Sequence, residues 1–195
     1  MKHIFKTVIT VSISAAAVVP AVAMAHTGHE TSGLMAGITH PFTGLDHLLA
    51  MVAVGLWAAQ MGGKATWQLP LAFIVTMAFG AGLSMLGVTV PFVEGGILAS
   101  VIAAGLLVAF AARFNILLCT ALTAGMAMFH GVAHGAEMPV AASGLSYMGG
   151  FLLATLVLHL AGIALIKAGK PAIAAMTARI VGAGIAAGGL VLAVI

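Results

Sequence analysis

Residues Phe129–Glu137 read FHGVAHGAE and end an apolar segment that is long enough to cross a bilayer. On a helix, His130, His134 and Glu137 are four and three residues apart, so two imidazoles and a carboxylate project from one face within two turns. An ionisable group at membrane depth costs about 3 kcal/mol and usually marks an ion or proton path. The stretch therefore predicts a membrane helix that carries ligands for a metal ion.

The composition supports a membrane protein and excludes several other classes. Of the 195 residues, 63% are hydrophobic and only 6% are charged, which is outside the range of soluble globular domains. The net charge of +3 comes from a few basic residues spread along the chain, so nucleic-acid binding has no support. The lone cysteine, Cys119, excludes an internal disulfide and any multi-cysteine metal site. A metal ion here must therefore be bound by histidine, carboxylate and methionine.

The first 25 residues resemble a secretory signal peptide. Lys2 and Lys6 precede an apolar run, and Ala23-Met24-Ala25 fits the small-x-small cleavage rule. Cleavage predicts a mature chain of residues 26–195 that forms a single transmembrane domain and begins at His26. The alternative is an uncleaved first membrane helix. His26 and His29 are secondary metal-ligand candidates at the surface, although short exposed tails with histidines often bind nothing.

The rest of the chain predicts an all-α integral membrane protein with six transmembrane helices after the cleavable signal peptide. About 20 apolar residues span a bilayer, and Gly, Pro or charged residues separate six such segments: 33–60, 68–88, 93–112, 115–136, 142–166 and 172–195. The loops on one side hold Lys64, Arg113, Lys167 and Lys170, which the positive-inside rule assigns to the cytoplasm. Both mature termini are therefore expected on the opposite, periplasmic side.

A second polar motif lies in the first of these segments, where residues 40–47 read HPFTGLDH. Pro41 suits a first helical position, so the sequence predicts a helix from near His40 to Gln60. His40 and His47 are seven residues apart and share a face of such a helix. Asp46 lies about 10 Å further into the membrane than the outer end of this helix.

The two motifs are expected to meet at one depth in the membrane, because their helices run in opposite directions. The predicted metal ligands are the six ionisable residues of both motifs: His40, Asp46, His47, His130, His134 and Glu137. A structural hydrogen-bond network without metal is the alternative. Met51 and Met126 continue the two faces inward and are secondary candidates, with core packing as the alternative. A structural role is favoured for the isolated His159.

The two motifs resemble the signatures of the HupE/UreJ family of nickel and cobalt permeases. The similarity extends over most of the mature chain and includes residues 48–55, LLAMVAVG, and residues 91–94, PFVE. The resemblance implies uptake of Ni²⁺ or Co²⁺ across a bacterial inner membrane, often for hydrogenase, urease or cobalamin pathways. It makes cytoplasmic metal chaperones of hydrogenase or urease maturation candidate partners, and a second copy of the chain is another.

The expected activity is transport without ATP and without a prosthetic group. Gly62-Gly63-Lys64-Ala65 lacks the spacing and the hydroxyl residue of a phosphate-binding loop, so a gradient, the membrane potential or cytoplasmic sequestration must drive uptake. We expect ions to be collected near His40 and Glu137 and then passed inward along Met51 and Met126. The chain is not expected to be an enzyme. Two alternatives stay open: an intramembrane zinc-dependent hydrolase and a bis-histidine haem protein.

Overall fold

A computed structural model describes residues 33–140 and 142–195 of the chain. The described part contains seven α-helices and no strand: α1 Gly33–Thr43, α2 Leu45–Met61, α3 Ala65–Met85, α4 Val93–Ala109, α5 Ile116–Ala136, α6 Gly144–Lys167 and α7 Pro171–Leu192. The predicted signal peptide, His26 and His29 lie outside the described residues.

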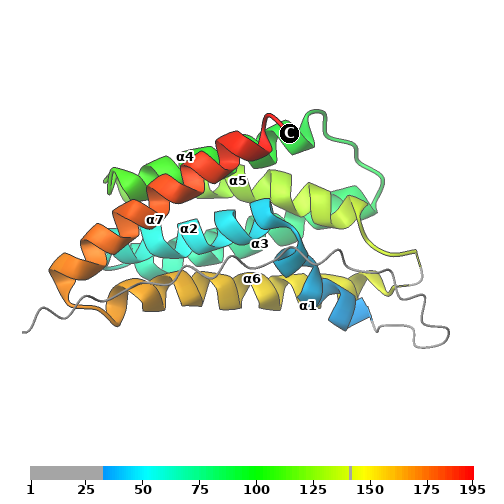
Figure 1. Ribbon diagram of the computed structural model, residues 1–195. Helices are drawn as coiled ribbons and strands as arrows, with labels where there is room; N and C mark the ends of the chain where they lie inside the picture. Colours follow the sequence, from blue (N-terminus) through cyan, green and yellow to red (C-terminus); the bar gives the residue numbers. More distant parts are fainter. Residues whose placement is uncertain (1–32, 141) are drawn as a thin grey trace, which may run out of the picture.

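Helix α2 is at the centre of the bundle and packs against α3, α4 and α6 (Figure 1). Helix α5 lies along α3, α7 lies along α4, and the short α1 packs against α6. Apolar side chains fill the space around α2, among them Leu56, Trp57, Phe73 and Phe151, each at most 1% exposed. One end of the bundle holds α1 and the C-terminus of α5 (Figure 1). The other end holds the α2–α3 and α6–α7 connections.

The predicted segment 33–60 is helical but is not one continuous helix, because the structure breaks it at Gly44 into α1 and α2, which meet at 82°. The predicted start near His40 is wrong, since α1 begins at Gly33 and Pro41 lies inside it. Proline has no N–H to continue the helical hydrogen bonds, and α1 ends two residues later. Gly44 is extended (φ −90°, ψ 111°), and a Cβ there would lie 3.0 Å from Asp46 Oδ1. The absent side chain leaves room for the Asp46 carboxylate.

Four of the described helices are long and apolar enough to cross a membrane, namely α3, α5, α6 and α7. The bent α1–α2 pair brings the number to five if it counts as one span. Helix α4 is apolar but has 17 residues. The six predicted segments all coincide with helices, and these helices make the chain a multi-pass membrane protein.

Helices α3 and α5 approach each other closely along the glycines of the fourth predicted segment. A Cβ on Gly131 would lie 2.2 Å from the Met77 carbonyl oxygen, and one on Gly135 would lie 2.5 Å from that of Ala81. Both positions therefore need glycine, as small-x-x-x-small packing requires. The close contact fixes the face of α5 that carries His130 and His134.

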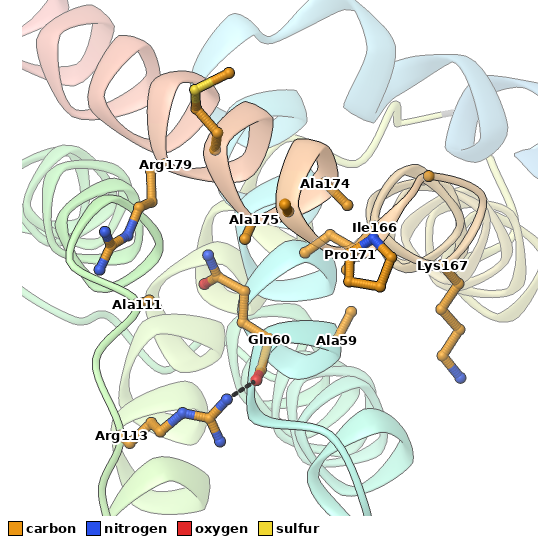
Figure 2. A pocket seen from close by; sticks show the side chains of 13 residues that line it. Ala59, Gln60, Ala111, Arg113, Ile166, Lys167, Pro171, Ala174, Ala175 and Arg179 are labelled. Carbon is orange, nitrogen blue, oxygen red and sulfur yellow. Dashed lines mark hydrogen bonds between the residues drawn. The ribbon is translucent and has the colours of Figure 1, made fainter.

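Charged side chains are divided between the two ends of the bundle. The Lys and Arg residues of the described chain lie at or near the α2–α3, α4–α5 and α6–α7 connections: Lys64, Arg113, Lys167, Lys170 and Arg179. The acidic residues lie toward the other end: Asp46, Glu94 and Glu137. A cavity of about 750 Å³ at the basic end is lined by Arg113, Lys167 and Arg179, among others. Figure 2 shows the Arg113 guanidinium at this cavity, where it donates a 2.8 Å hydrogen bond to the Gln60 carbonyl.

The predicted signal peptide gives a direct test at the N-terminus. If cleavage follows Ala25, intact-mass spectrometry of protein purified from membranes should identify His26 as the first residue. A chain that retained Met1 would contradict cleavage and would add a helix before residue 33.

Candidate metal-ion site

The outermost part of the site is an ion pair between α1 and the end of α5. His40 Nε2 lies 2.7 Å from Glu137 Oε2, and the two side chains are 27% and 45% exposed. Glu137 follows the last residue of α5 and caps that helix. The hydrogen bond from His40 lowers the pKa of Glu137 below its usual 4.5, although partial burial opposes this shift. The Glu137 carboxylate is therefore charged at neutral pH.

This pair lies beside a cavity of about 380 Å³, which reaches the His40 side chain. The cavity is lined by residues of α1, the end of α5 and the start of α6: Met35, Ala36, Thr39, His40, Thr43, Glu137, Pro139 and Tyr147. It is thus bounded by His40 and Glu137, the same two side chains that pair with each other.

The start of α2 holds the second pair, Asp46 and His47. Asp46 Oδ1 accepts hydrogen bonds from the His47 backbone N–H at 2.7 Å and from His47 Nδ1 at 2.8 Å. Because a carboxylate only accepts, Nδ1 carries the hydrogen and Nε2 is left with a free lone pair. The buried Nε2 has no hydrogen-bond partner among the described residues. A carboxylate that orients a histidine in this way is typical of metal ligands.

His130 and His134 supply two more imidazoles from α5, and both side chains are fully buried. His130 Nδ1 donates to the Met126 carbonyl oxygen at 3.0 Å, so its Nε2 also keeps a lone pair and has no partner in the described part of the chain. Neither ring nitrogen of His134 has a partner there. Unpaired buried polar atoms are costly, and so many in one place need an explanation such as a bound ion or water.

The four imidazoles form a continuous series from the cavity inward. The His134 ring lies 4.9 Å from the His40 ring and 4.6 Å from the His47 ring, measured between centroids, and His47 lies 5.0 Å from His130. The structure thus brings together all six predicted ligands, which we call the imidazole cluster: His40, Asp46, His47, His130, His134 and Glu137.

These side chains are neighbours without converging on one point. Among the residues that the structure describes, no three His, Cys, Asp or Glu side chains are placed to hold a metal ion together. Four of the possible metal ligands are already hydrogen-bonded in pairs: His40 with Glu137, and Asp46 with His47. An ion can therefore gain three ligands only if the His40–Glu137 pair opens or the imidazoles turn.

Helix α6 contributes a wall to the site that we did not predict. His134 stacks on Phe151 with ring centroids 4.5 Å apart and planes 7° apart, and the Tyr147 ring lies 6.0 Å from that of His40. Tyr147, Phe151, Thr155 and His159 follow one another at four-residue intervals on α6 and are all buried. That spacing is visible in the sequence and indicates a single helix face, but it does not show that this face meets the histidines.

The two secondary methionines have different environments. Met51 is fully buried and accepts a 3.2 Å hydrogen bond from Thr155 Oγ1, one turn inward from His47. Met126 lines a groove between α4 and α5 together with Ala103 and Leu122, so the structure does not place its side chain with the cluster. The prediction that Met126 is a secondary ligand therefore has no contact with the cluster to support it, and core packing is the environment seen.

Comparison with known proteins agrees with the two sequence motifs. The family model described as HupE / UreJ protein matches residues 14–192. The chain is also 42% identical over 186 residues to Protein HupE of Rhizobium leguminosarum bv. viciae, covering 95% of this chain and 97% of that protein. No solved structure matches the chain. The family match over nearly the whole chain shows that this protein belongs to the HupE/UreJ family.

Proposed function

We propose that the protein is an ATP-independent transporter that takes up Ni²⁺ or Co²⁺ across the bacterial inner membrane through the imidazole cluster. The observation that carries this proposal is the series of four neighbouring imidazoles and two carboxylates beside an open cavity. Imidazole is a borderline ligand that suits nickel and cobalt, whereas the hard ions Mg²⁺ and Ca²⁺ prefer oxygen. Membership of the HupE/UreJ family supports the same ions.

The distribution of charge supports a direction for transport. All the basic residues of the described part lie toward one end of the bundle, and the positive-inside rule assigns that end to the cytoplasm. The cavity beside His40 and Glu137 is at the other end and then opens to the periplasm. The Glu137 carboxylate at this entrance attracts a cation, and the deeper Asp46 carboxylate offsets part of the cost of removing its water.

The His40–Glu137 pair gives the entrance a simple mechanism. An arriving ion competes with His40 for the Glu137 carboxylate, and the released His40 imidazole then faces the same ion. From there His134 lies within reach of both His40 and His47, so the ion can exchange one imidazole for the next. Binding at each step must stay weak enough for the ion to leave.

Acid is expected to inhibit uptake. Imidazole binds metal only when deprotonated, so the initial rate should fall between about pH 7 and pH 5.5 at constant free Ni²⁺ and constant membrane potential. Because pairing with His40 lowers the pKa of Glu137 below 4.5, this carboxylate stays charged throughout that range. The acid inhibition should therefore persist in Glu137→Gln. Faster uptake on acidifying the outside would contradict this mechanism and indicate import coupled to protons.

The experiment that tests the proposal is metal entry into proteoliposomes. Purified protein is reconstituted with a metal-sensitive dye trapped inside, a potential negative inside is imposed, and Ni²⁺, Co²⁺ or Mg²⁺ is added outside. We expect saturable entry of Ni²⁺ and Co²⁺ and little entry of Mg²⁺. No entry above protein-free liposomes, together with zinc that stays bound through purification, would contradict transport and favour the hydrolase.

A further inference from the structure

A second group of potential ligands lies directly inward of the imidazole cluster and contains no carboxylate. Thr155 Oγ1 is 3.2 Å from the sulfur of Met51 and 3.9 Å from the sulfur of Met77. All three side chains are completely buried. They come from α6, α2 and α3, so three helices direct a hydroxyl and two thioethers to one place.

His159 lies one helical turn beyond Thr155 on the same face of α6 and is also completely buried. Neither of its ring nitrogens has a hydrogen-bond partner within residues 33–140 and 142–195. The sequence favoured a structural role for His159, but a structural histidine in an apolar core normally has a bonded partner. Both ring nitrogens are therefore available to a ligand.

The two groups are joined through one aromatic side chain. The Phe73 ring lies 5.0 Å from the His159 ring and 5.6 Å from that of His130, between centroids. Met51 is one turn beyond His47 on α2, a step of about 6 Å along the helix axis. Met51, Met77, Thr155 and His159 are therefore the next potential ligands from His47 and His130 toward the basic end.

We propose that Met51, Met77, Thr155 and His159 form an inner transit site for a late first-row transition-metal ion. The inference deepens the proposed transport function and rests on it. Thioether and imidazole donors select soft and borderline ions, whereas Mn²⁺ prefers oxygen ligands. The imidazole cluster disfavours Mg²⁺ and Ca²⁺ but still offers two carboxylates to Mn²⁺, so the inner site adds the discrimination of Co²⁺ or Ni²⁺ against Mn²⁺.

The absence of a carboxylate among these four side chains is consistent with a brief stay. A dehydrated divalent ion has no compensating charge there, so it binds weakly and is released toward the cytoplasm. Close packing keeps the site in shape, because a Cβ on Gly55 of α2 would lie 2.2 Å from the His159 carbonyl oxygen. Helices α2 and α6 are therefore in direct backbone contact at this depth.

The test compares the wild-type chain with Met51→Leu/Met77→Leu, using Co²⁺ as the probe. Leucine conserves the volume of methionine and is usually tolerated in a core, but it removes both sulfurs. The matched control is Met128→Leu/Met148→Leu, which removes two thioethers from α5 and α6 outside the proposed site. Thermal unfolding of each purified protein verifies that all three are folded.

Two measurements are made on these proteins. X-ray absorption at the cobalt edge, with excess Co²⁺, should show sulfur neighbours in the wild type and the control but not in Met51→Leu/Met77→Leu. In proteoliposomes, the ratio of Co²⁺ to Mn²⁺ uptake should fall by about tenfold in the same variant. This is the lower end of the loss in metal affinity that follows when groups around a metal ligand are changed.

The inference is overturned if the wild type shows no sulfur neighbour, or if Met51→Leu/Met77→Leu keeps both the sulfur signal and the wild-type uptake ratio. Failure of the proposed function has a different signature, because the wild type would then move no divalent ion at all. The cobalt spectrum needs no transport and still tests the site in that case.

Discussion

Replacing His134 with phenylalanine is expected to reduce Ni²⁺ uptake by about 100-fold or more. Mutating even a residue that only hydrogen-bonds to a metal ligand lowers metal affinity or activity by about 10- to 100-fold. His134 is the imidazole that contacts both His40 and His47, so it links the entrance to the rest of the cluster. Phenylalanine keeps an aromatic ring that can stack on Phe151 but removes both nitrogens. Initial rates in proteoliposomes measure the effect.

The control for this variant is Phe129→Leu, which changes an aromatic side chain on the same helix. The Phe129 ring packs over Gly96 of α4 and has no metal-binding atom. Equal yield and unfolding temperature for both variants, with uptake lost only in His134→Phe, would assign the loss to the missing nitrogens. Normal uptake by folded His134→Phe would remove His134 from the route.

The second large effect is expected for Asp46→Asn, which should lower the maximal rate by about 10- to 100-fold. The Asp46 carboxylate holds His47 Nδ1 at 2.8 Å and supplies charge next to the deeper imidazoles. Asparagine keeps the shape but loses the negative charge that offsets a dehydrated divalent ion. Rates measured over a wide range of Ni²⁺ concentrations separate a change in maximal rate from a change in half-saturation.

Glu137→Gln is the matched comparison, since it makes the same chemical change at the entrance. The Glu137 side chain is 45% exposed, so water and salt screen its charge. We expect this variant mainly to raise the Ni²⁺ concentration needed for half-maximal rate. Loss of transport at saturating metal in Glu137→Gln, with only a concentration shift in Asp46→Asn, would contradict the assignment of Glu137 to the entrance and of Asp46 to the deeper part of the site.

The positions of the helices could be predicted well from the sequence, because long apolar segments between Gly, Pro and charged residues leave few alternatives. The break at Gly44 was missed. Periodicity within residues 33–60 is compatible with one helix, and Pro41 and Gly44, which lie at the break, do not by themselves specify a bend of 82°. His40 and His47 were expected on one face of a single helix, but the bend places them on two helices with ring centroids 6.0 Å apart.

The ligand candidates were predictable because ionisable residues are conspicuous in an apolar chain. Their neighbours were not, since Tyr147, Phe151 and Thr155 are ordinary residues for a membrane helix. Only the packing of α6 against α1 and α2 brings them to the histidines. The role of Asp46 was also incompletely predicted, because spacing does not reveal that its carboxylate bonds to the adjacent His47.

Equilibrium binding of radioactive Ni²⁺ tests most directly whether the imidazole cluster holds the transported ion. The purified full chain and the double variant His130→Phe/His134→Phe are compared near neutral pH, with Met128→Leu/Met148→Leu as the folded control. We predict exchangeable Ni²⁺ binding by the wild type and the control, and a loss of affinity of about 100-fold or more in the double variant. Wild-type affinity in a folded His130→Phe/His134→Phe protein would contradict the account.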